Sequence, residues 1–204
     1  MKLYWSSRSP YARKVMVFAH ETGLAGRIAC VRTLVMMTRP NADLLQIHPL
    51  GKIPALVLDD GTVLYDSAVI CEYLDTLHDR PKLFPPSGPA RWTALRLHAL
   101  GNNLLDNLVP WRNETLRPPA QQSPETLAAW ALKTRHAVAA LDHETDALAA
   151  TPLHIGHVAI GCALGYLDFR FSSLDWRAGN ARIRRWYDTY AQRPAMQQTL
   201  PVDQ

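Results

Sequence analysis

The sequence predicts an α/β domain followed by an all-helical domain, and three observations carry this prediction. Strand and helix patterns alternate over residues 1–79. Residues 80–89 are rich in proline, which is typical of a linker between domains. Strand patterns vanish from residues 90–204, where apolar residues recur with helical spacing. We therefore expect one domain at residues 1–79, a linker at 80–89 and a second domain at 90–204.

The composition limits the classes of function. The 204 residues are 48% hydrophobic and 20% charged, with a net charge of +4, which is ordinary for a globular protein with a sizeable core. Basic residues gather only at residues 182–185, which we interpret as a solvated face or a subunit contact, so we expect no nucleic-acid partner. Neither a signal peptide nor an apolar run of about 20 residues is found, so we expect a cytoplasmic protein without a membrane partner. Cys30, Cys71 and Cys162 lack metal-ligand spacing and lie among apolar residues, which predicts buried thiols, a reducing compartment and no metal.

The first domain begins with a strand–helix–strand unit. Pro10 suits the first turn of a helix, and Ser9 suits its N-cap. Gly23 or Gly26 should end this helix. The surrounding elements are expected as strands at 2–6 and 28–34, one short helix within 39–47, strands at 55–58 and 62–65 around Asp59-Asp60-Gly61, and a helix from Asp66 with Val69, Ile70, Tyr73, Leu74 and Leu77 on one face.

The start of the helix at Asp66 offers groups that suit a ligand. The free N–H groups and the positive dipole end of a helix start form an anion site, to which Ser67 adds a hydroxyl. Asp66 can accept a hydrogen bond from an ammonium, so the pair suits a free amino acid head group. A plain helix cap is the alternative interpretation. Pro54, just before the buried strand, lacks an N–H, and a cis bond there would expose the neighbouring backbone to an extended peptide ligand.

Four helices are expected after the linker. The first covers residues 91–107, and Pro110 should kink or end it. The second begins at the cap and first-turn proline of Ser123-Pro124. Residues 153–171 are apolar on every side, which predicts a buried central helix. The last, at residues 180–193, is amphipathic and should end at the proline that follows.

Three runs together resemble the cytosolic glutathione S-transferases. They are Ser9-Pro10-Tyr11, then Lys52-Ile53-Pro54 with the hairpin and Asp66-Ser67, and residues 161–170, which are similar to the core helix of bacterial members. Each run alone is a weak signal, but the combination is specific and covers the whole chain. The resemblance implies a thioredoxin-like N-terminal domain, a C-terminal helical bundle, glutathione as co-substrate and a homodimer.

The resemblance also implies a way to activate the glutathione thiol. Tau-class transferases carry their catalytic serine in a Ser-Pro-Phe motif, which Ser9-Pro10-Tyr11 resembles. A hydroxyl donor at a helix N-terminus favours the nucleophilic thiolate. The alternative interpretation is that Ser9 is an N-cap alone; Ser6 and Ser7 are rivals for the donor role, and Tyr4 is a weaker one. The loop holds no cysteine, which argues against the mixed-disulfide chemistry of omega- and beta-like classes.

The remaining site residues follow from the same resemblance. Lys52 would meet the glycine carboxylate of glutathione, or else be a solvated lysine. The main chain of Ile53, beside Pro54, would pair with the cysteinyl backbone, while Asp66 and Ser67 would hold the amino acid head. A pocket between the domains would take an apolar electrophile, and its weaker candidates, each also explicable as structural, are Asn102, Asn103, Trp111 and Tyr166.

The implied function is conjugation of the glutathione thiolate to small apolar electrophiles, as in detoxification. Two alternatives stay open. One is a glutathione-dependent isomerase, dehalogenase or peroxidase on the same fold. The other is a non-catalytic glutathione-binding module, because a fold alone does not fix function.

One departure from the family concerns the start of the core helix. Relatives usually begin it with a Ser/Thr-x-x-Asp cap, and His154 and His157 stand at the matching positions. Only neutral imidazole accepts a hydrogen bond, so capping histidines should have folded pKa values below about 6.5. We expect His154→Ser with His157→Asp to stabilise the fold by about 1–2 kcal/mol. The competing interpretation is that Thr151 caps and Pro152 starts the helix one turn earlier.

Overall fold

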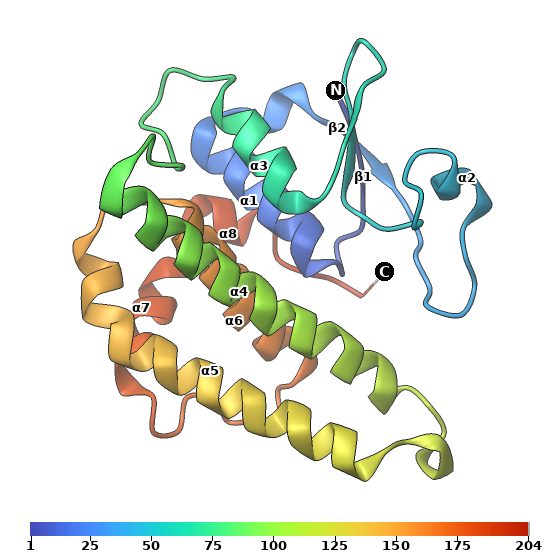
Figure 1. Cartoon of the computed structure of the whole chain (residues 1–204), viewed down its shortest axis with the longest axis vertical. Helices are drawn as coiled ribbons and strands as arrows, with labels where there is room; N and C mark the ends of the chain where they lie inside the picture. The colour runs from blue at the N-terminus through green and yellow to red at the C-terminus, as the bar shows by residue number, and fades with distance from the viewer. Residues whose placement is uncertain (204) are drawn as a thin grey trace. The chain divides into compact units, whose positions relative to one another are not determined.

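The computed structural model describes residues 1–203, which divide into two compact units (Figure 1). One comprises residues 1–86 with 194–203, and the other comprises Ser87–Arg193. The C-terminal segment therefore departs from the helical domain expected at 90–204. Its helix α8 (Pro194–Gln197) packs on helix α1, where the guanidinium of Arg13 donates to the carbonyl oxygen of Met196 at 3.2 Å.

The first unit is built on a four-stranded mixed sheet. Its strands are β1 (Lys2–Trp5), β2 (Ala29–Arg32), β3 (Ala55–Val57) and β4 (Val63–Leu64), in the spatial order β2-β1-β3-β4. β1 is parallel to β2 and antiparallel to β3, and β3 is antiparallel to β4. The end of β1, the start of β3 and the end of β4 consequently lie at one end of the sheet. The expected thioredoxin-like order of strands and helices is confirmed.

The helices of this unit begin and end at the residues that cap them. Ser9 is the N-cap of α1 (Pro10–Thr22), and Gly23 is its C-cap with φ +79°, a left-handed conformation that glycine adopts without strain. Asp66 is the N-cap of α3 (Ser67–Asp75). The short elements are the 3-10 turn η1 (Ala25–Arg27) and helix α2 (Ala42–Leu45).

Two burial predictions for this unit are wrong. Cys30 is exposed, because β2 is the edge strand and all four of its residues are exposed. Val69 is exposed as well, since α3 turns Ile70, Cys71 and Leu74 toward the core. The side chain of Val69 therefore faces solvent.

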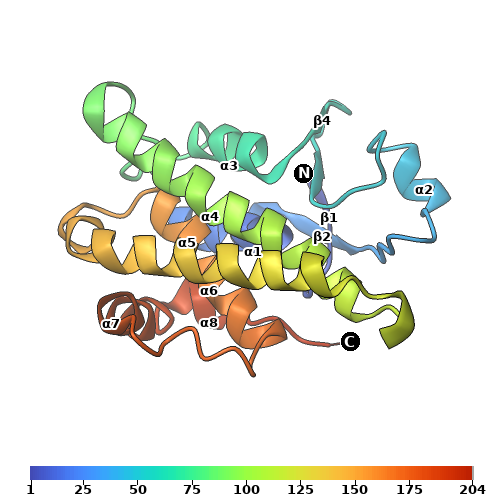
Figure 2. The same cartoon turned by 60° about the horizontal axis from the view of Figure 1, so that its bottom comes forward.

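The second unit is all-helical, as expected. Its elements are α4 (Gly88–Thr115), the 3-10 turn η2 (Pro119–Gln121), α5 (Pro124–Ala150), α6 (Ile155–Arg170) and α7 (Ala181–Tyr190). α6 is buried from Ile155 through Leu167, which confirms the predicted central helix. α4 packs along α6 and beside α5, while α7 packs against α5 (Figure 2).

Helix α4 does not end at Pro110 but continues to Thr115. Proline forfeits one backbone hydrogen bond within a helix. The buried side chains of Leu104, Leu105 and Leu108 anchor the preceding turns, so packing outweighs that local cost.

The two histidines cap α6 as predicted. His154 is the N-cap, and its Nδ1 accepts from the N–H of Gly156 at 3.1 Å. The N–H of His154 in turn donates to Nδ1 of His157 at 3.1 Å. Thr151 is instead the C-cap of α5, so the competing start one turn earlier is wrong.

Candidate active site

Three segments meet at this end of the sheet in the first unit. The loop Ser6–Ser9 follows β1, Lys52 to Pro54 precede β3, and Asp66 follows β4. The peptide bonds Ile53–Pro54 and Tyr65–Asp66 are both cis. Most of the residues that the sequence predicts for glutathione binding and activation thus lie around one end of the sheet.

The first turn of α3 holds a polar group that is buried without a partner. Ser67 is 1% exposed, and its hydroxyl forms no hydrogen bond with any residue of the described chain. Such a group is costly to leave unsatisfied, so it marks a position where a ligand or water completes the structure. The N-terminus of α3 favours a negatively charged ligand atom at that position.

Asp66 lies beside this hydroxyl and keeps part of its carboxylate available. Its Oδ1 accepts from the N–H of Ala68 at 2.9 Å, which is the N-cap contact. The side chain is exposed. A carboxylate has about four acceptor positions, so capping and the binding of an ammonium are compatible.

The segment before β3 presents main-chain and cationic groups. The main chain of Ile53 forms no hydrogen bond within residues 1–203, which leaves its N–H and C=O open to an extended ligand. Lys52 is exposed and forms no ion pair there. Nδ1 of buried His48 accepts from the N–H of Leu50 at 3.0 Å, which places this histidine in the turn just before Lys52. Burial lowers the pKa of His48, and the positive charge of Lys52 lowers it further.

Ser9 closes the first strand–helix turn. Its Oγ accepts from the N–H of Ala12 at 3.2 Å, the N-cap contact of α1. A hydroxyl has one donor hydrogen besides its acceptor positions. Ser9 can therefore cap α1 and still donate to a sulfur atom placed at the N-terminus of this helix.

The rival serines differ in how their hydroxyls are used. Ser7 donates to the carbonyl oxygen of Val202 at 3.1 Å, so its hydrogen is already engaged. The Oγ of Ser6 accepts from the N–H of Arg8 at 3.3 Å. Like that of Ser9, its hydroxyl hydrogen has no acceptor among the described residues and is available to a ligand. The sequence could not identify Val202 as a partner, because the contact joins opposite ends of the chain. Of the three serines, Ser6 and Ser9 are therefore the two still able to donate.

The four residues expected to line a second-substrate pocket lie in the helical unit. The ring of Trp111 packs on that of Phe171 with 4.6 Å between centroids, and buried Tyr166 approaches Phe171 edge-on at 6.5 Å. The structure thus joins two of the four through Phe171, which the sequence predicted only as the end of a helix. Asn102 Nδ2 lies 3.3 Å from Nε2 of a histidine one turn earlier, and Asn103 is exposed.

Comparisons with known proteins identify the family of this chain. The family model described as glutathione S-transferase, N-terminal domain, matches residues 8–77. A crystal structure of a glutathione transferase family member from Pseudomonas fluorescens Pf-5, with bound glutathione, is 43% identical, covers 99% of each chain and has a TM-score of 0.96. This chain belongs to the glutathione S-transferase family.

Further relatives of this glutathione S-transferase family member extend over its full length. A crystal structure of a family member from the same Pseudomonas strain, with bound S-(propanoic acid)-glutathione, is 42% identical, covers 98% of this chain and 99% of that one, and has a TM-score of 0.92. The uncharacterized GST-like protein YibF of Escherichia coli K12 is 28% identical and covers 98% of each chain. Over residues 1–203, no helix is long and apolar enough to cross a membrane, and no group of three or more His, Cys, Asp or Glu is placed to hold a metal ion.

Proposed function

We propose that this chain binds glutathione at the end of the sheet where β1 and β4 end and β3 begins, and conjugates its thiolate to small apolar electrophiles. The observation that carries the proposal is the buried hydroxyl of Ser67, which has no partner in the described chain. A carboxylate of the ligand would accept from this hydroxyl and from the first N–H groups of α3. Asp66 would accept from the ammonium of the same amino acid head.

The rest of the peptide would run along the start of β3. The open main chain of Ile53 supplies one donor and one acceptor, which an extended cysteinyl residue pairs with. Lys52 would meet the carboxylate at the other end of the peptide. The bound glutathione and S-(propanoic acid)-glutathione in the Pseudomonas relatives support a site of this kind that also admits a substituent on sulfur.

Ser9 would hold the sulfur as a thiolate. A free thiol has a pKa of about 8.5, so only a small share is the nucleophilic thiolate at neutral pH. A hydroxyl donor and the N-terminus of α1 both stabilise the anion. Each pKa unit by which they lower the thiol corresponds to about 1.36 kcal/mol. The thiolate then forms a C–S bond with the electrophilic carbon; in a substitution the leaving group departs as an anion, and in an addition the resulting carbanion takes a proton from water.

Calorimetry with glutathione tests the binding half of this proposal. Ser67→Ala and Asp66→Ala should each weaken binding by about 1–3 kcal/mol, since each removes one polar partner of the ligand. Asp60→Ala, which changes an exposed carboxylate in the β3–β4 turn, is the matched control and should bind as wild type. Unchanged affinity in both site variants would refute the assigned head-group site.

Turnover of 1-chloro-2,4-dinitrobenzene tests the catalytic half. Ser9→Ala should lower turnover by on the order of 10- to 150-fold, with little change in glutathione affinity. Ser9→Thr keeps the hydroxyl and should retain most activity. Loss of turnover in Ser6→Ala, with wild-type turnover in Ser9→Ala, would move the donor role to Ser6.

The same experiments separate the alternative functions. Glutathione binding without turnover of any electrophile would indicate a binding module. Turnover confined to isomerisation, dehalogenation or peroxide reduction would indicate those enzyme classes. We also propose a cytoplasmic homodimer with a detoxifying role, and sedimentation analysis of the purified chain would test the dimer.

A further inference from the structure

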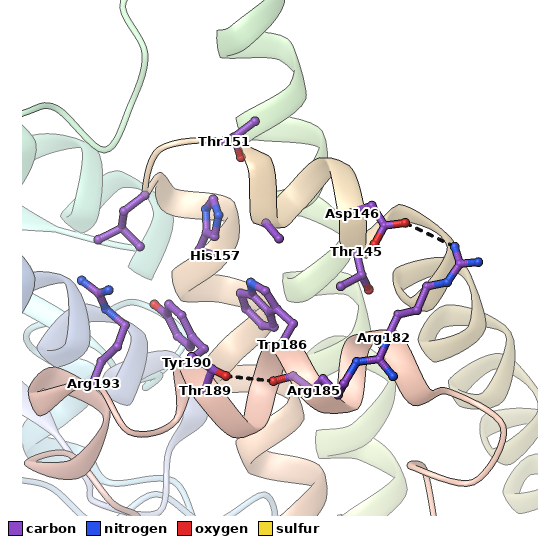
Figure 3. Close-up of a pocket in the computed structure, with 12 residues that line it drawn as sticks. Thr145, Asp146, Thr151, His157, Arg182, Arg185, Trp186, Thr189, Tyr190 and Arg193 are labelled. Atoms are coloured by element: carbon purple, nitrogen blue, oxygen red, sulfur yellow. Dashed lines mark hydrogen bonds and ion pairs between the residues drawn. The ribbon is translucent and has the colours of Figure 1, made fainter.

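Four histidines are buried among the described residues, and one of them lies beside the candidate active site. His154 and His157 cap α6, and Figure 3 shows the ring of His157 at a pocket of the helical unit. His98 lies within α4 and contacts a side chain one turn later. The fourth, His48, is 6% exposed and comes four residues before Lys52. The reaction proposed above gives this buried side chain no role.

The backbone of His48 connects the end of α2 to the turn that leads into β3. Its N–H donates to the carbonyl oxygen of Leu44 at 2.8 Å, and its carbonyl oxygen accepts from the N–H of Gly51 at 2.8 Å. Leu44 is 1% exposed, so the start of this turn is anchored in the core. Gly51 has a φ of +56°, which glycine adopts without strain. The turn therefore leads from a fixed point to Lys52 and Ile53.

The imidazole ring adds a contact that only its neutral form can make. Nδ1 of His48 accepts from the N–H of Leu50 at 3.0 Å, within the same turn. An imidazolium has no acceptor, so the ring carries its hydrogen on Nε2. Burial lowers the pKa of His48, with a smaller contribution from the positive charge of Lys52, which favours the neutral ring. The side chain thus orders the backbone just before Lys52.

The same ring contacts the other half of the candidate site. Its centroid is 4.2 Å from that of Tyr65, with 45° between the two planes. Aromatic pairs at this spacing stabilise each other beyond the area that they bury. Tyr65 directly precedes Asp66, the N-cap of α3. His48 therefore contacts both the segment before β3 and the turn before α3.

We propose that His48 is a positioning residue, which holds Lys52 at the spacing from Asp66 that an extended glutathione spans. This inference rests on the proposed function, in which Lys52 meets one end of the peptide and Asp66 meets the other. Nδ1 orders the turn before Lys52, while the face of the ring packs on Tyr65. Loss of either contact lets one segment move relative to the other. The competent arrangement is then less populated, and the apparent affinity for glutathione falls by the same fraction.

Three variants of His48 separate the two contacts. His48→Phe keeps a ring against Tyr65 but has no acceptor for the N–H of Leu50. His48→Asn loses the ring but keeps the acceptor, because asparagine Oδ1 accepts from the N–H two residues later in turns of this kind. His48→Leu has neither. Tyr65→Leu removes the other ring, and Tyr65→Phe is its matched control.

Calorimetry with glutathione measures the affinity of each variant. We expect His48→Phe to weaken binding about five- to tenfold, and His48→Asn only about two- to threefold. His48→Leu loses both contacts and should be weakened more than about tenfold. Tyr65→Leu should match His48→Asn, and Tyr65→Phe should bind as wild type. His136→Leu makes the same change of residue type at an exposed position of α5 and should also bind as wild type.

Two further measurements distinguish positioning from general damage. Amide hydrogen exchange of the full chain without glutathione should be faster at Leu50 and Gly51 in His48→Phe, and as slow as wild type in His48→Asn. Turnover of 1-chloro-2,4-dinitrobenzene at saturating glutathione should stay within about twofold of wild type in His48→Phe. The reason is that Ser9, which would hold the thiolate, belongs to another segment.

The outcomes decide the role of His48 separately from the proposed function. Wild-type affinity in His48→Phe would overturn the inference, as would a His48→Asn variant that binds no more tightly than His48→Phe. Wild-type affinity in Tyr65→Leu would overturn the link to Asp66. Binding that is weakened in Ser67→Ala but in no variant of His48 would leave the glutathione site standing and refute its positioning by this ring. A wild type that binds no glutathione would refute both.

Discussion

The paired histidines at the start of α6 make the stability of this chain depend on pH. His154 and His157 are each 5% exposed, and each accepts a backbone N–H at Nδ1. Nε2 of His157 is 3.0 Å from the carbonyl oxygen of Leu148 and donates to it. These contacts require both rings to be neutral with hydrogen on Nε2, because an imidazolium has no acceptor. A proton on either ring would also oppose the dipole of α6.

The pKa values give the size and sign of this dependence. Burial lowers the pKa of His154 to about 4, and the neighbouring His157 contributes to the shift. Burial also lowers the pKa of His157, with a smaller contribution from the positive charge of Arg193. The unfolded chain therefore binds more protons below about pH 6.5, so this stability is present above that pH and is lost on acidification. The full shift of His154 corresponds to about 3 kcal/mol, of which about 1 kcal/mol is lost between about pH 7 and 5.5.

The double variant His154→Ser with His157→Asp should remove this dependence. A serine–aspartate capping box keeps the same two backbone contacts, and its carboxylate favours the helix N-terminus. The carbonyl of Leu148 loses one donor but keeps the hydroxyl of Thr151 at 2.9 Å. We expect a gain of about 1–2 kcal/mol at neutral pH.

Denaturant melts at about pH 7 and 5.5 measure both the stability gain and its pH slope. The wild type should lose about 1–2 kcal/mol over this range from the two histidines, and the double variant should lose less. His136→Asn changes an exposed histidine on α5 and is the control, expected to behave as wild type. A double variant that is no more stable and has the same pH slope would refute the role of these rings as a titrating cap.

Two further predictions concern packing and loop closure, and both are read from urea melts. Asp75→Ala should lower the free energy of unfolding by about 2–4 kcal/mol, because this buried carboxylate accepts from the N–H groups of Leu83 and Phe84, each at 3.0 Å. A loss of stability below about 0.5 kcal/mol would contradict this prediction. Gly101→Ala should destabilise by about 1–3 kcal/mol, because a Cβ there would lie 2.7 Å from the backbone of Ala159. Gly26→Ala meets no atom within 4 Å and should be neutral or slightly stabilising.

Local chemistry made much of the fold predictable. Ser9, Asp66 and Ser123 were each expected to begin a helix, and each accepts a backbone N–H within its own first turn. His154 and His157 likewise satisfy each other within one turn of α6. Caps of this kind are written in three or four consecutive residues, so the sequence alone contains the information.

Features that depend on distant residues were not predictable. Cys30 lies in an apolar run, yet its exposure follows from the edge position of β2 in the assembled sheet. Pro110 is a helix breaker by local rules, but the burial of neighbouring leucines carries α4 past it. The hydrogen bond from Ser7 to Val202 joins residues 195 positions apart. Only the tertiary structure reveals such contacts.

The candidate site divides in the same way. The position of Asp66 and Ser67 at a helix start was readable from the turn that precedes them. The complete burial of the Ser67 hydroxyl without a partner was not, because it depends on how α3 packs.

The central claim is that the site binds glutathione and holds its sulfur as a thiolate, and a pH titration of the bound thiol tests it most directly. Ultraviolet absorbance of the thiolate is followed in the complex of the full chain with glutathione. We predict a thiol pKa well below the free value of about 8.5 in wild type, and a rise of about 1–2 units in Ser9→Ala. A bound thiol that titrates at the free value in wild type would contradict the account.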